Sequence, residues 1–332
     1  MFDTDNVPQS WKPQIDSSMS TSRNVSPLKV VSLFAGCGGM DLGFRGGFEF
    51  LGKKYSKNKF DILWANDFSL PACQTYALNV GKHIHHGDIW TEMDHIPPAA
   101  DVVIGGFPCQ DISINGKGAG VDGKRSGLYR AMVEVVKRCR PKIFVAENVK
   151  GLLMRHNAES LKRVLHDFEQ LGYELTYQLY LAADYGVPQA RERVIIVGRL
   201  PEVKSFVPPK ATLNRTQHIT ASAAVNDLEN MPEDEKFNHV WSRANKSSEQ
   251  GSRKLSPDRP SQTIRAECHG NIQFHYSLNR RISMREAARF QSFPDNFAFQ
   301  GGLRQTERQV GNAVPPVLAW HIARAVQQTL LR

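Results

Sequence analysis

The sequence predicts an α/β protein that is built on a mostly parallel β-sheet and carries a second, smaller domain. Short apolar runs alternate with segments of helical pattern between about residues 28 and 198. A glycine-rich turn follows the first run, and the alternation gives way to polar sequence containing Pro, Asn and Ser from about residue 201 to 275. Alternating strands and helices favour a parallel sheet, because each helix returns the chain to the edge where the next strand begins.

The strands are predicted from short apolar runs that end at glycine or polar residues. They comprise residues 28–34, 60–66, 83–89, 101–105, 142–146, 173–182 and 193–198. A helix is predicted after Ser69, a suitable N-cap with Pro71 in the first turn, and two more over residues 127–139 and 159–171. Since no helix separates the last two strands, we expect an antiparallel edge to the sheet.

The ends of the chain and its middle differ from this pattern. Residues 1–27 are rich in Ser, Thr, Asn, Asp and Pro without an apolar period, so we expect a largely disordered leader. Ser283 and Glu286 form a capping box that predicts a helix, and a final amphipathic helix starts near Pro316. The larger domain should therefore comprise residues 28–200 and 303–332, and the smaller domain with its hinge residues 201–302.

The composition favours an anionic partner without requiring one. The net charge is +9 and the pI about 9.3, and lysines and arginines that neutralise phosphates release counterions on binding. Five cysteines without a CxxC pair argue against a disulfide framework and a four-ligand zinc site, so we expect no metal. The chain has neither an apolar stretch of about 20 residues nor a signal peptide, so we expect a cytoplasmic protein with no membrane partner.

The turn FAGCGG (residues 34–39) lets backbone come close to a ligand, because glycine lacks the Cβ atom that would collide. Such a turn serves NAD, FAD and S-adenosylmethionine equally, and it also occurs as a plain strand-to-helix connection. Asp67 follows the second strand, where a carboxylate can bind two ribose hydroxyls. Asp88 follows the third strand, where it can meet an adenine amino group. Each aspartate also has the pattern of a solvated helix cap.

Cys109 follows a strand end and the turn GGFP, so its thiol should face the crevice beyond the carboxyl ends of the parallel strands. Glu147 ends the next strand and reaches the same edge. A thiolate nucleophile with a nearby acid suits covalent catalysis, whereas a buried cysteine and a structural salt bridge are the alternatives.

Two arginines and the other four cysteines have plain structural alternatives. Arg191 and Arg193 offer guanidinium donors at the start of the last strand, with an exposed ion-pair run as the alternative. The other cysteines lack a crevice position with a nearby acid, so we expect them to be ordinary buried residues. They are Cys37, Cys73, Cys139 and Cys268.

Six blocks of the sequence resemble the motifs of the DNA (cytosine-5) methyltransferase family. They are FAGCGG (34–39), GGFPCQ (105–110), ENVKG (147–151), QARERVIIVG (189–198), REAARFQSFPDNF (285–297) and QVGNAVPP (309–316). The blocks stand in the family's order and extend from about residue 28 to the C-terminus, which is far more specific than any single motif. The resemblance is to the prokaryotic, restriction-modification type. It implies a Rossmann-like, S-adenosylmethionine-dependent methyltransferase sheet, and it makes residues 201–302 a target-recognition domain and hinge.

The resemblance also implies roles for individual residues. The catalytic set is Cys109, Glu147 and Arg193, with Arg191 in support. The implied cofactor contacts are Phe34, Gly36, Gly38, Asp67, Asp88, Ile89, Phe107, Pro108 and Asn312. The implied DNA contacts are Gln110, Ser113, Arg125, Thr263 and Arg265. The family's active-site loop corresponds to residues 110–126, where Ile112 stands at the position of a usual Phe.

In the implied reaction, the enzyme extrudes a cytosine from duplex DNA and Cys109 adds to carbon 6. That addition makes carbon 5 able to accept the methyl group of S-adenosylmethionine, while Glu147 stabilises the charge that grows at N3. Loss of the proton at carbon 5 then expels Cys109. We expect a monomer in the prokaryotic cytosol or nucleoid, and a cognate restriction endonuclease that shares its recognition sequence.

Three other functions would each explain part of the sequence. A tRNA cytosine-5 methyltransferase would share the fold and motifs, but its Cys-Phe-Thr signature and reduced recognition region are not found here. A nicotinamide-dependent oxidoreductase would explain the glycine turn and Asp67 but leaves Cys109 and Glu147 without a role. A catalytically inactive, DNA-binding relative is disfavoured by the presence of both residues.

Overall fold

The computed structural model describes residues 26–107, 127–244, 253–266 and 272–331. Its centre is a seven-stranded sheet with the order β5-β4-β1-β6-β7-β10-β8. These strands are β1 (Leu28–Leu33), β4 (Phe60–Asp67), β5 (Ile84–His86), β6 (Val102–Gly105), β7 (Ile143–Val149), β8 (Glu174–Leu181) and β10 (Glu192–Arg199). The expected α/β class with a mostly parallel sheet is confirmed.

The strand directions follow from the connections between the strands. The five strands from β5 to β7 are mutually parallel, whereas β10 runs antiparallel to both β7 and β8. The predicted antiparallel pairing of the last two strands is therefore confirmed. Every residue of β6 is buried, as expected for a parallel strand that is covered on both faces.

Apolar side chains from successive residues of the sheet pack on opposite faces. Val30 belongs to a cluster with α1 (Gly39–Arg45) and α9 (Pro316–Leu331), and Val31 to a second cluster with α4 (Leu128–Cys139) and α5 (Ala158–Glu169). In α1, an added Cβ at Gly43 would lie 2.4 Å from the Cβ of Ala319. The two ends of the described chain therefore pack tightly together, with α9 beside the elements that follow β1.

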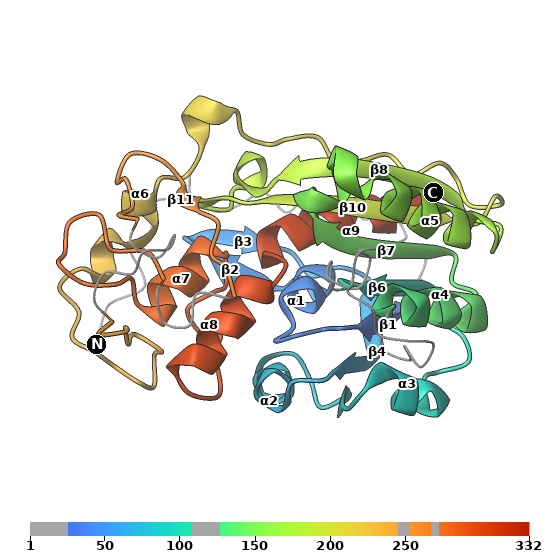
Figure 1. The fold of residues 1–332 in the computed structure, drawn as a ribbon, viewed down its shortest axis with the longest axis horizontal. Helices are drawn as coiled ribbons and strands as arrows, with labels where there is room; N and C mark the ends of the chain where they lie inside the picture. Colours follow the sequence, from blue (N-terminus) through green and yellow to red (C-terminus); the bar gives the residue numbers. More distant parts are fainter. Residues whose placement is uncertain (1–25, 108–126, 245–252, 267–271, 332) are drawn as a thin grey trace, which may run out of the picture.

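A third apolar cluster joins the α1 region to the segment that sequence analysis assigned to the smaller domain. Figure 1 shows α6, α7 and α8 gathered at one end of the sheet, and α4 and α5 at the other. This end contains α6 (Ala221–Val225), α7 (Met284–Phe290), α8 (Leu303–Asn312) and the short parallel pair β9 (Gln189–Ala190) and β11 (Ser261–Gln262). The division at residues 201 and 302 stays a prediction.

Several local predictions are confirmed and others were missed. Ser283 Oγ accepts a hydrogen bond from Glu286 N, and Ser283 N donates to the Glu286 carboxylate, so α7 begins with the expected capping box. Ser69 is the N-cap of α2 (Leu70–Asn79), although its side chain makes no capping bond. The pattern missed α3 (Ile89–Glu92), α8 and the hairpin of β2 (Phe48–Phe50) and β3 (Lys53–Tyr55).

Within the described residues, no helix has both the length and the apolar character needed to cross a membrane.

Candidate active site

The glycine turn after β1 has the backbone conformation that glycine adopts easily. Gly36 has φ +57° and Gly38 has φ +93°, both in the left-handed region. A Cβ added at Gly38 would lie 2.7 Å from Val80 and 2.9 Å from Tyr76, so packing excludes a side chain there. A Cβ added at Gly36 would meet no atom within 4 Å. The face of Gly36 is therefore open space beside the carboxyl end of the sheet.

Asp67, at the end of β4, holds this turn in place. Its Oδ2 accepts a hydrogen bond from Gly36 N at 2.8 Å, and its Oδ1 accepts one from Ser69 N at 2.9 Å. Burial raises the pKa of Asp67 above its ordinary value, although the two amide bonds act in the opposite direction. Each carboxylate oxygen has two lone pairs, so both can accept a further bond from a ligand hydroxyl.

Asp88 and Ile89 lie at the next crossover of the sheet. Asp88 is the N-cap of α3, and its Oδ1 accepts a hydrogen bond from Trp90 N at 3.0 Å. Ile89 is 2% exposed and packs in the sheet cluster. The helix-cap alternative therefore describes Asp88 well, and one of its carboxylate oxygens already has a backbone partner.

A buried ion pair lies where β7 and β10 meet. Glu147 Oε1 lies 2.7 Å from Arg193 Nε, and both side chains are about nine-tenths buried. Burial lowers the pKa of the Arg193 guanidinium, and Glu147 opposes that shift. Water screens electrostatic interactions, and little water reaches this pair. Its charges can therefore bind and polarise a planar polar ring more strongly than two exposed side chains would.

The same carboxylate lies over the chain that leads to Cys109. A Cβ added at Gly106 would lie 2.9 Å from Glu147 Oε2, so only glycine fits there without displacing the carboxylate. Asn148 Nδ2 donates to the carbonyl of Phe107 at 3.0 Å, and Asn148 Oδ1 accepts from Val149 N. The ENV run therefore fixes the backbone two residues before Cys109.

Some residues from the sequence analysis lie outside the described residues. They are Pro108, Cys109, Gln110, Ile112, Ser113, Arg125 and Cys268. The active-site loop predicted at residues 110–126 lies outside the described residues as well.

A profile of the family described as C-5 cytosine-specific DNA methylase matches residues 28–254 and 235–328. The Type II methyltransferase M.NgoFVII of Neisseria gonorrhoeae is 36% identical, over 93% of this chain and 88% of the relative. The Type II methyltransferase M.NgoPII of the same organism is 32% identical, over 94% of this chain and 99% of the relative. The chain belongs to the C-5 cytosine-specific DNA methylase family.

The fold agrees with this family. The structure of S. pombe Dnmt2 methyltransferase superposes with a TM-score of 0.65 at 18% identity, covering 91% of this chain and 99% of that one. This likeness supports the fold alone. The family profile and the Type II relatives confirm the predicted recognition as a cytosine-5 DNA methyltransferase of the restriction-modification type.

The two arginines of the methylase block QARERVIIVG differ in their surroundings. Arg193 forms an ion pair with Glu147, whereas Arg191 is 1% exposed and makes its hydrogen bonds to backbone carbonyls. Arg191 Nη1 donates to the carbonyl of Ile264 at 3.1 Å, and its Nη2 donates to the carbonyl of Gly311 at 2.8 Å. The alternative of an exposed ion-pair run is therefore wrong for both arginines, since both are buried.

Asn312, at the end of α8, follows Gly311 and is exposed. The segment that carries it reaches the glycine turn, because the Sγ of Cys37 lies 3.7 Å from the Gln309 carbonyl. A Cβ added at Gly39 would also lie 2.5 Å from the carbonyl of Val314. Asn312 thus comes from the far end of the chain to the neighbourhood of Gly36.

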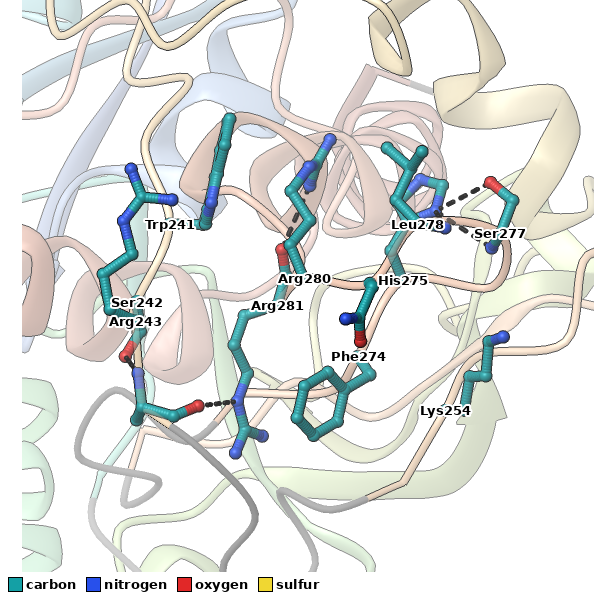
Figure 2. A pocket seen from close by; sticks show the side chains of 12 residues that line it. Trp241, Ser242, Arg243, Lys254, Phe274, His275, Ser277, Leu278, Arg280 and Arg281 are labelled. Atoms are coloured by element: carbon teal, nitrogen blue, oxygen red, sulfur yellow. Dashed lines mark hydrogen bonds between the residues drawn. The ribbon is translucent and has the colours of Figure 1, made fainter.

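A basic pocket of about 760 Å³ is lined by residues that precede α7 in the sequence (Figure 2). Its cations differ in how free they are. Arg280 makes two hydrogen bonds to the buried Glu286, and Arg281 is buried and donates to the Ala244 and Ile272 carbonyls. Arg243 and Lys254 are both exposed, and Arg243 pairs with Glu233. The remaining lining residues are Trp241, Ser242, Ala244, Phe274, His275, Ser277, Leu278 and Asn279.

Thr263 and Arg265 lie between this pocket and the sheet. Thr263 Oγ1 donates to the Ala190 carbonyl at 3.0 Å, and Gln273 Nε2 donates to the Thr263 carbonyl at 3.3 Å. Arg265 is exposed. The hydroxyl of Thr263 therefore already binds the sheet, whereas Arg265 is open to solvent.

The three remaining described cysteines are buried and free, as expected for plain core residues. Burial raises the pKa of Cys73 to about 12 and that of Cys139 to about 11, and it raises the pKa of Cys37 further. These groups are thiols at neutral pH, so they are poor nucleophiles.

Sequence reasoning missed several residues that shape the site. Phe68 directly follows Asp67 and is 75% exposed, so its ring can lie against a planar ligand group. The position of Phe68, an aromatic residue in the turn after a buried strand, could have predicted this contact from the sequence. Asn148 gave no such signal, because its bond to Phe107 joins two strands that are far apart in sequence.

His85, Glu92 and His95 form a group of side chains on the surface that could hold a metal ion, which sequence analysis did not anticipate. Glu92 Oε2 already lies 2.9 Å from His95 Nδ1, three residues along the chain, and both histidines are well exposed. We assign these contacts to a surface His–Glu pair, and no metal enters the proposals below.

Proposed function

We propose that this protein is a DNA (cytosine-5-)-methyltransferase that methylates a flipped-out cytosine within a short specific sequence of duplex DNA. Family membership supports the reaction class, and one observation supports the site. The buried pair Glu147–Arg193 lies at the carboxyl edge of the sheet, with Glu147 against Gly106, three residues before Cys109.

In this proposal Cys109 acts as the nucleophile. Its thiolate forms a bond to carbon 6 of the cytosine, and the ring becomes electron-rich at carbon 5. Glu147 in its acid form donates a hydrogen bond or its proton to N3 as negative charge grows there, and Arg193 both holds Glu147 and donates to the O2 of the ring. After methyl transfer, water takes the proton from carbon 5, the electron pair of that C–H bond re-forms the double bond between carbons 5 and 6, and the bond from carbon 6 to sulfur breaks to release the thiolate of Cys109.

S-adenosylmethionine supplies the methyl group in this reaction. Gly36 presents open space where a side chain would intrude, and Asp67 keeps lone pairs free for ribose hydroxyls. The exposed ring of Phe68 beside Asp67 suits an adenine face. We propose the cofactor contacts named from the resemblance, which are Phe34, Gly36, Gly38, Asp67, Asp88, Ile89, Phe107, Pro108 and Asn312, and we add Phe68.

Duplex DNA is the proposed partner, and the basic pocket supports a surface for it. Arg243 and Lys254 are exposed, and no lining residue is acidic, although Glu233 outside the lining pairs with Arg243. We propose that residues 201–302 form the target-recognition domain and hinge, and that sequence is read in the major groove. The other proposed DNA contacts are Gln110, Ser113, Arg125, Thr263 and Arg265.

The relatives named Type II methyltransferases support a biological setting. We propose that this enzyme is the modification half of a restriction-modification system and protects the sequence that a cognate endonuclease cuts. It would act as a monomer in the prokaryotic cytosol, at the nucleoid.

The test is expression in a host that lacks DNA methylation. Bisulfite sequencing should show protected cytosines at one short motif, and chromatography of hydrolysed DNA should identify them as 5-methylcytosine. Cys109→Ala should abolish the signal, whereas Cys139→Ala, which changes a buried thiol in α4, should keep it. Unmodified DNA, marking that survives in Cys109→Ala, or 5-methylcytosine confined to the host's tRNA would each overturn the proposal.

A further inference from the structure

Side chains from the β9 segment bind both backbone groups of Ile264. Gln189 is fully buried, and its Oε1 accepts a hydrogen bond from Ile264 N at 3.0 Å. Arg191 donates to the Ile264 carbonyl at 3.1 Å. Because buried backbone groups are costly to leave without partners, these two side chains fix the position of Ile264 against the sheet.

The guanidinium of Arg191 bridges Ile264 to a second segment. Its other Nη donates to the carbonyl of Gly311 at 2.8 Å. A Cβ added at Gly311 would lie 2.4 Å from the nitrogen of Ala266 and 2.6 Å from the carbonyl carbon of Arg265. The backbones of residues 264–266 and of Gly311 are therefore in direct contact, and Arg191 spans the contact.

The segment around Gly311 also touches the glycine turn on its other side. Val314 and Gln309 contact the turn at Gly39 and Cys37, as described above. Residues 309–314 thus lie between the glycine turn and residues 264–266. Gln291 strengthens this position, since its Nε2 donates to the carbonyls of Val310 and Ala313 and its Oε1 accepts from Gln189.

Residues 264–266 continue to the basic pocket. The Thr263 carbonyl accepts a hydrogen bond from Gln273, and the neighbouring Phe274 lines the pocket together with Lys254 (Figure 2). An unbroken series of contacts therefore runs from the pocket wall through Ile264, Arg191 and Gly311 to the glycine turn.

We propose that Arg191 is a positioning residue that couples binding of DNA at the recognition region to binding of the cofactor at the glycine turn. The inference rests on the proposed function, because that function assigns a ligand to each end of the series. The planar guanidinium suits this role, since its fork of donors holds two carbonyls at a fixed separation, whereas an ammonium group is a single point of charge. If DNA binding displaces Ile264, Gly311 must move with it. Otherwise one of the buried hydrogen bonds from the Arg191 guanidinium to these two carbonyls breaks.

The test measures coupling rather than activity. S-adenosylhomocysteine serves as the cofactor probe, and its Kd is measured by calorimetry with and without a duplex that contains the motif mapped by bisulfite sequencing. We expect the duplex to tighten the wild-type Kd by roughly fivefold or more, the usual lower range for coupled sites. In Arg191→Lys the ratio of the two Kd values should fall to less than about twofold.

The chain offers a matched control in Arg285, which is also 1% exposed. Arg285 also donates to backbone carbonyls, which belong to Phe237, Pro294 and Phe297. All three lie within residues 201–302, so Arg285 does not reach the glycine turn. Arg285→Lys should lower the midpoint of urea unfolding as Arg191→Lys does and yet keep the wild-type ratio. A loss of stability alone therefore cannot imitate the expected result.

The experiments distinguish a failure of the coupling inference from a failure of the proposed function. Equal ratios in Arg191→Lys and Arg285→Lys, or a wild-type ratio near one, would overturn the inference while DNA methylation still supported the proposed function. Absence of DNA methylation would instead overturn the proposed function. If Arg191→Lys does not fold, Gly311→Ala probes the same contact from the other side, because its methyl group must displace residues 265–266. It should also lower the ratio, and an unchanged ratio there would count against the inference.

Discussion

The sheet and the region around α7 are held together in different ways. In the sheet, strands bond to strands and apolar clusters cover both faces. Around α7, long stretches lack regular structure, and buried arginines bind their carbonyls instead. Arg285 binds three carbonyls, Arg281 binds two and Arg289 binds that of Ala224.

The difference follows from what backbone requires. Every buried carbonyl needs a donor, and regular strands and helices provide one from the main chain. Where the chain is irregular, a guanidinium with five N–H groups can replace several main-chain donors at once. We therefore expect that changing a buried charged side chain around α7 lowers the free energy of unfolding. A charged side chain at the edge of the sheet can instead take part in catalysis without being needed for the fold.

The sharpest test of this comparison changes one glutamate in each region to glutamine. In the sheet, Glu147→Gln keeps an oxygen that can accept from Arg193 but cannot supply a proton to cytosine N3. We expect the single-turnover rate of methylation to fall by about 10² to 10⁴, the usual contribution of a general acid. The midpoint of urea unfolding should change little.

Glu192→Gln is the control for that variant, since Glu192 is half-buried, precedes Arg193 in the sequence and pairs with Lys150 rather than with Glu147. It should keep the wild-type rate. A Glu147→Gln enzyme with more than a tenth of the wild-type rate would remove the proposed role of Glu147 at N3.

Glu286 provides the contrasting case in α7. It is fully buried, binds Arg280 through both oxygens and accepts from Ser283 N. Removing one partner of a buried ion pair leaves the other charge without compensation, so Glu286→Gln should lower the free energy of unfolding by about 3 to 5 kcal/mol. The rate per folded molecule should stay near that of the wild type.

Glu174→Gln supplies the comparison in the sheet region, because Glu174 is exposed and its partner Arg199 also donates to the carbonyls of Leu200 and Val203. Urea unfolding should show a loss of at most about 1 kcal/mol. If Glu286→Gln and Glu174→Gln lower the free energy of unfolding equally, buried charges around α7 contribute no more to stability than surface charges do.

Sequence pattern predicted the sheet region well because the signals there are local. A buried strand such as β6 is a continuous apolar run, and a capping box such as that of Ser283 lies within four residues. The carboxyl edge of the sheet then brings Glu147 near the exit of β6 without any knowledge of distant contacts.

The other parts of the site depend on contacts that sequence pattern does not contain. Arg191 and Arg193 are two residues apart, and nothing local indicates that one binds Glu147 while the other binds Ile264 and Gly311. The elements of the region from about residue 201 to 275 are not evident from the sequence for a similar reason. Its turns and short helices form local bonds, but their placement depends on distant side chains, such as Arg285 on the Phe237 carbonyl and Arg289 on the Ala224 carbonyl.

A buried carboxyl group in the sheet region gives a further test. Asp41 in α1 accepts a hydrogen bond from the Tyr76 hydroxyl at 2.9 Å, and burial raises its pKa from 3.8 to about 6. The folded state therefore holds a proton that the unfolded state releases between these values. The contribution of Asp41 to stability is full below pH 3.8, falls as the pH rises to about 6, and is constant above.

Asp41→Asn removes this titration and keeps an oxygen for Tyr76. The free energy of unfolding of the wild type minus that of the variant should fall by about 2 to 3 kcal/mol between pH 4 and pH 7, at about 1.4 kcal/mol for each pKa unit. A difference that does not depend on pH would mean that the carboxyl group is charged throughout, as an arginine-paired group around α7 would be.

The smallest expected effect concerns Gly36 in the glycine turn, which we expect to matter for cofactor binding more than for stability. Gly36→Ala places a methyl group in open space, so the fold should lose only the roughly 1 to 2 kcal/mol that a left-handed alanine costs. The methyl group would occupy the space proposed for the cofactor, and the Kd for S-adenosylhomocysteine should rise about tenfold, or 1.4 kcal/mol.

Gly38→Ala separates this effect from strain in the turn. Gly38 shares the left-handed backbone, but its new methyl group would meet Val80 and Tyr76 instead of open space. Gly38→Ala should therefore lose more stability in urea than Gly36→Ala. At a temperature where both variants are folded, calorimetry should show the weaker cofactor binding in Gly36→Ala. Weaker binding in Gly38→Ala would mean that the rigidity of the turn, rather than the open face of Gly36, determines cofactor affinity.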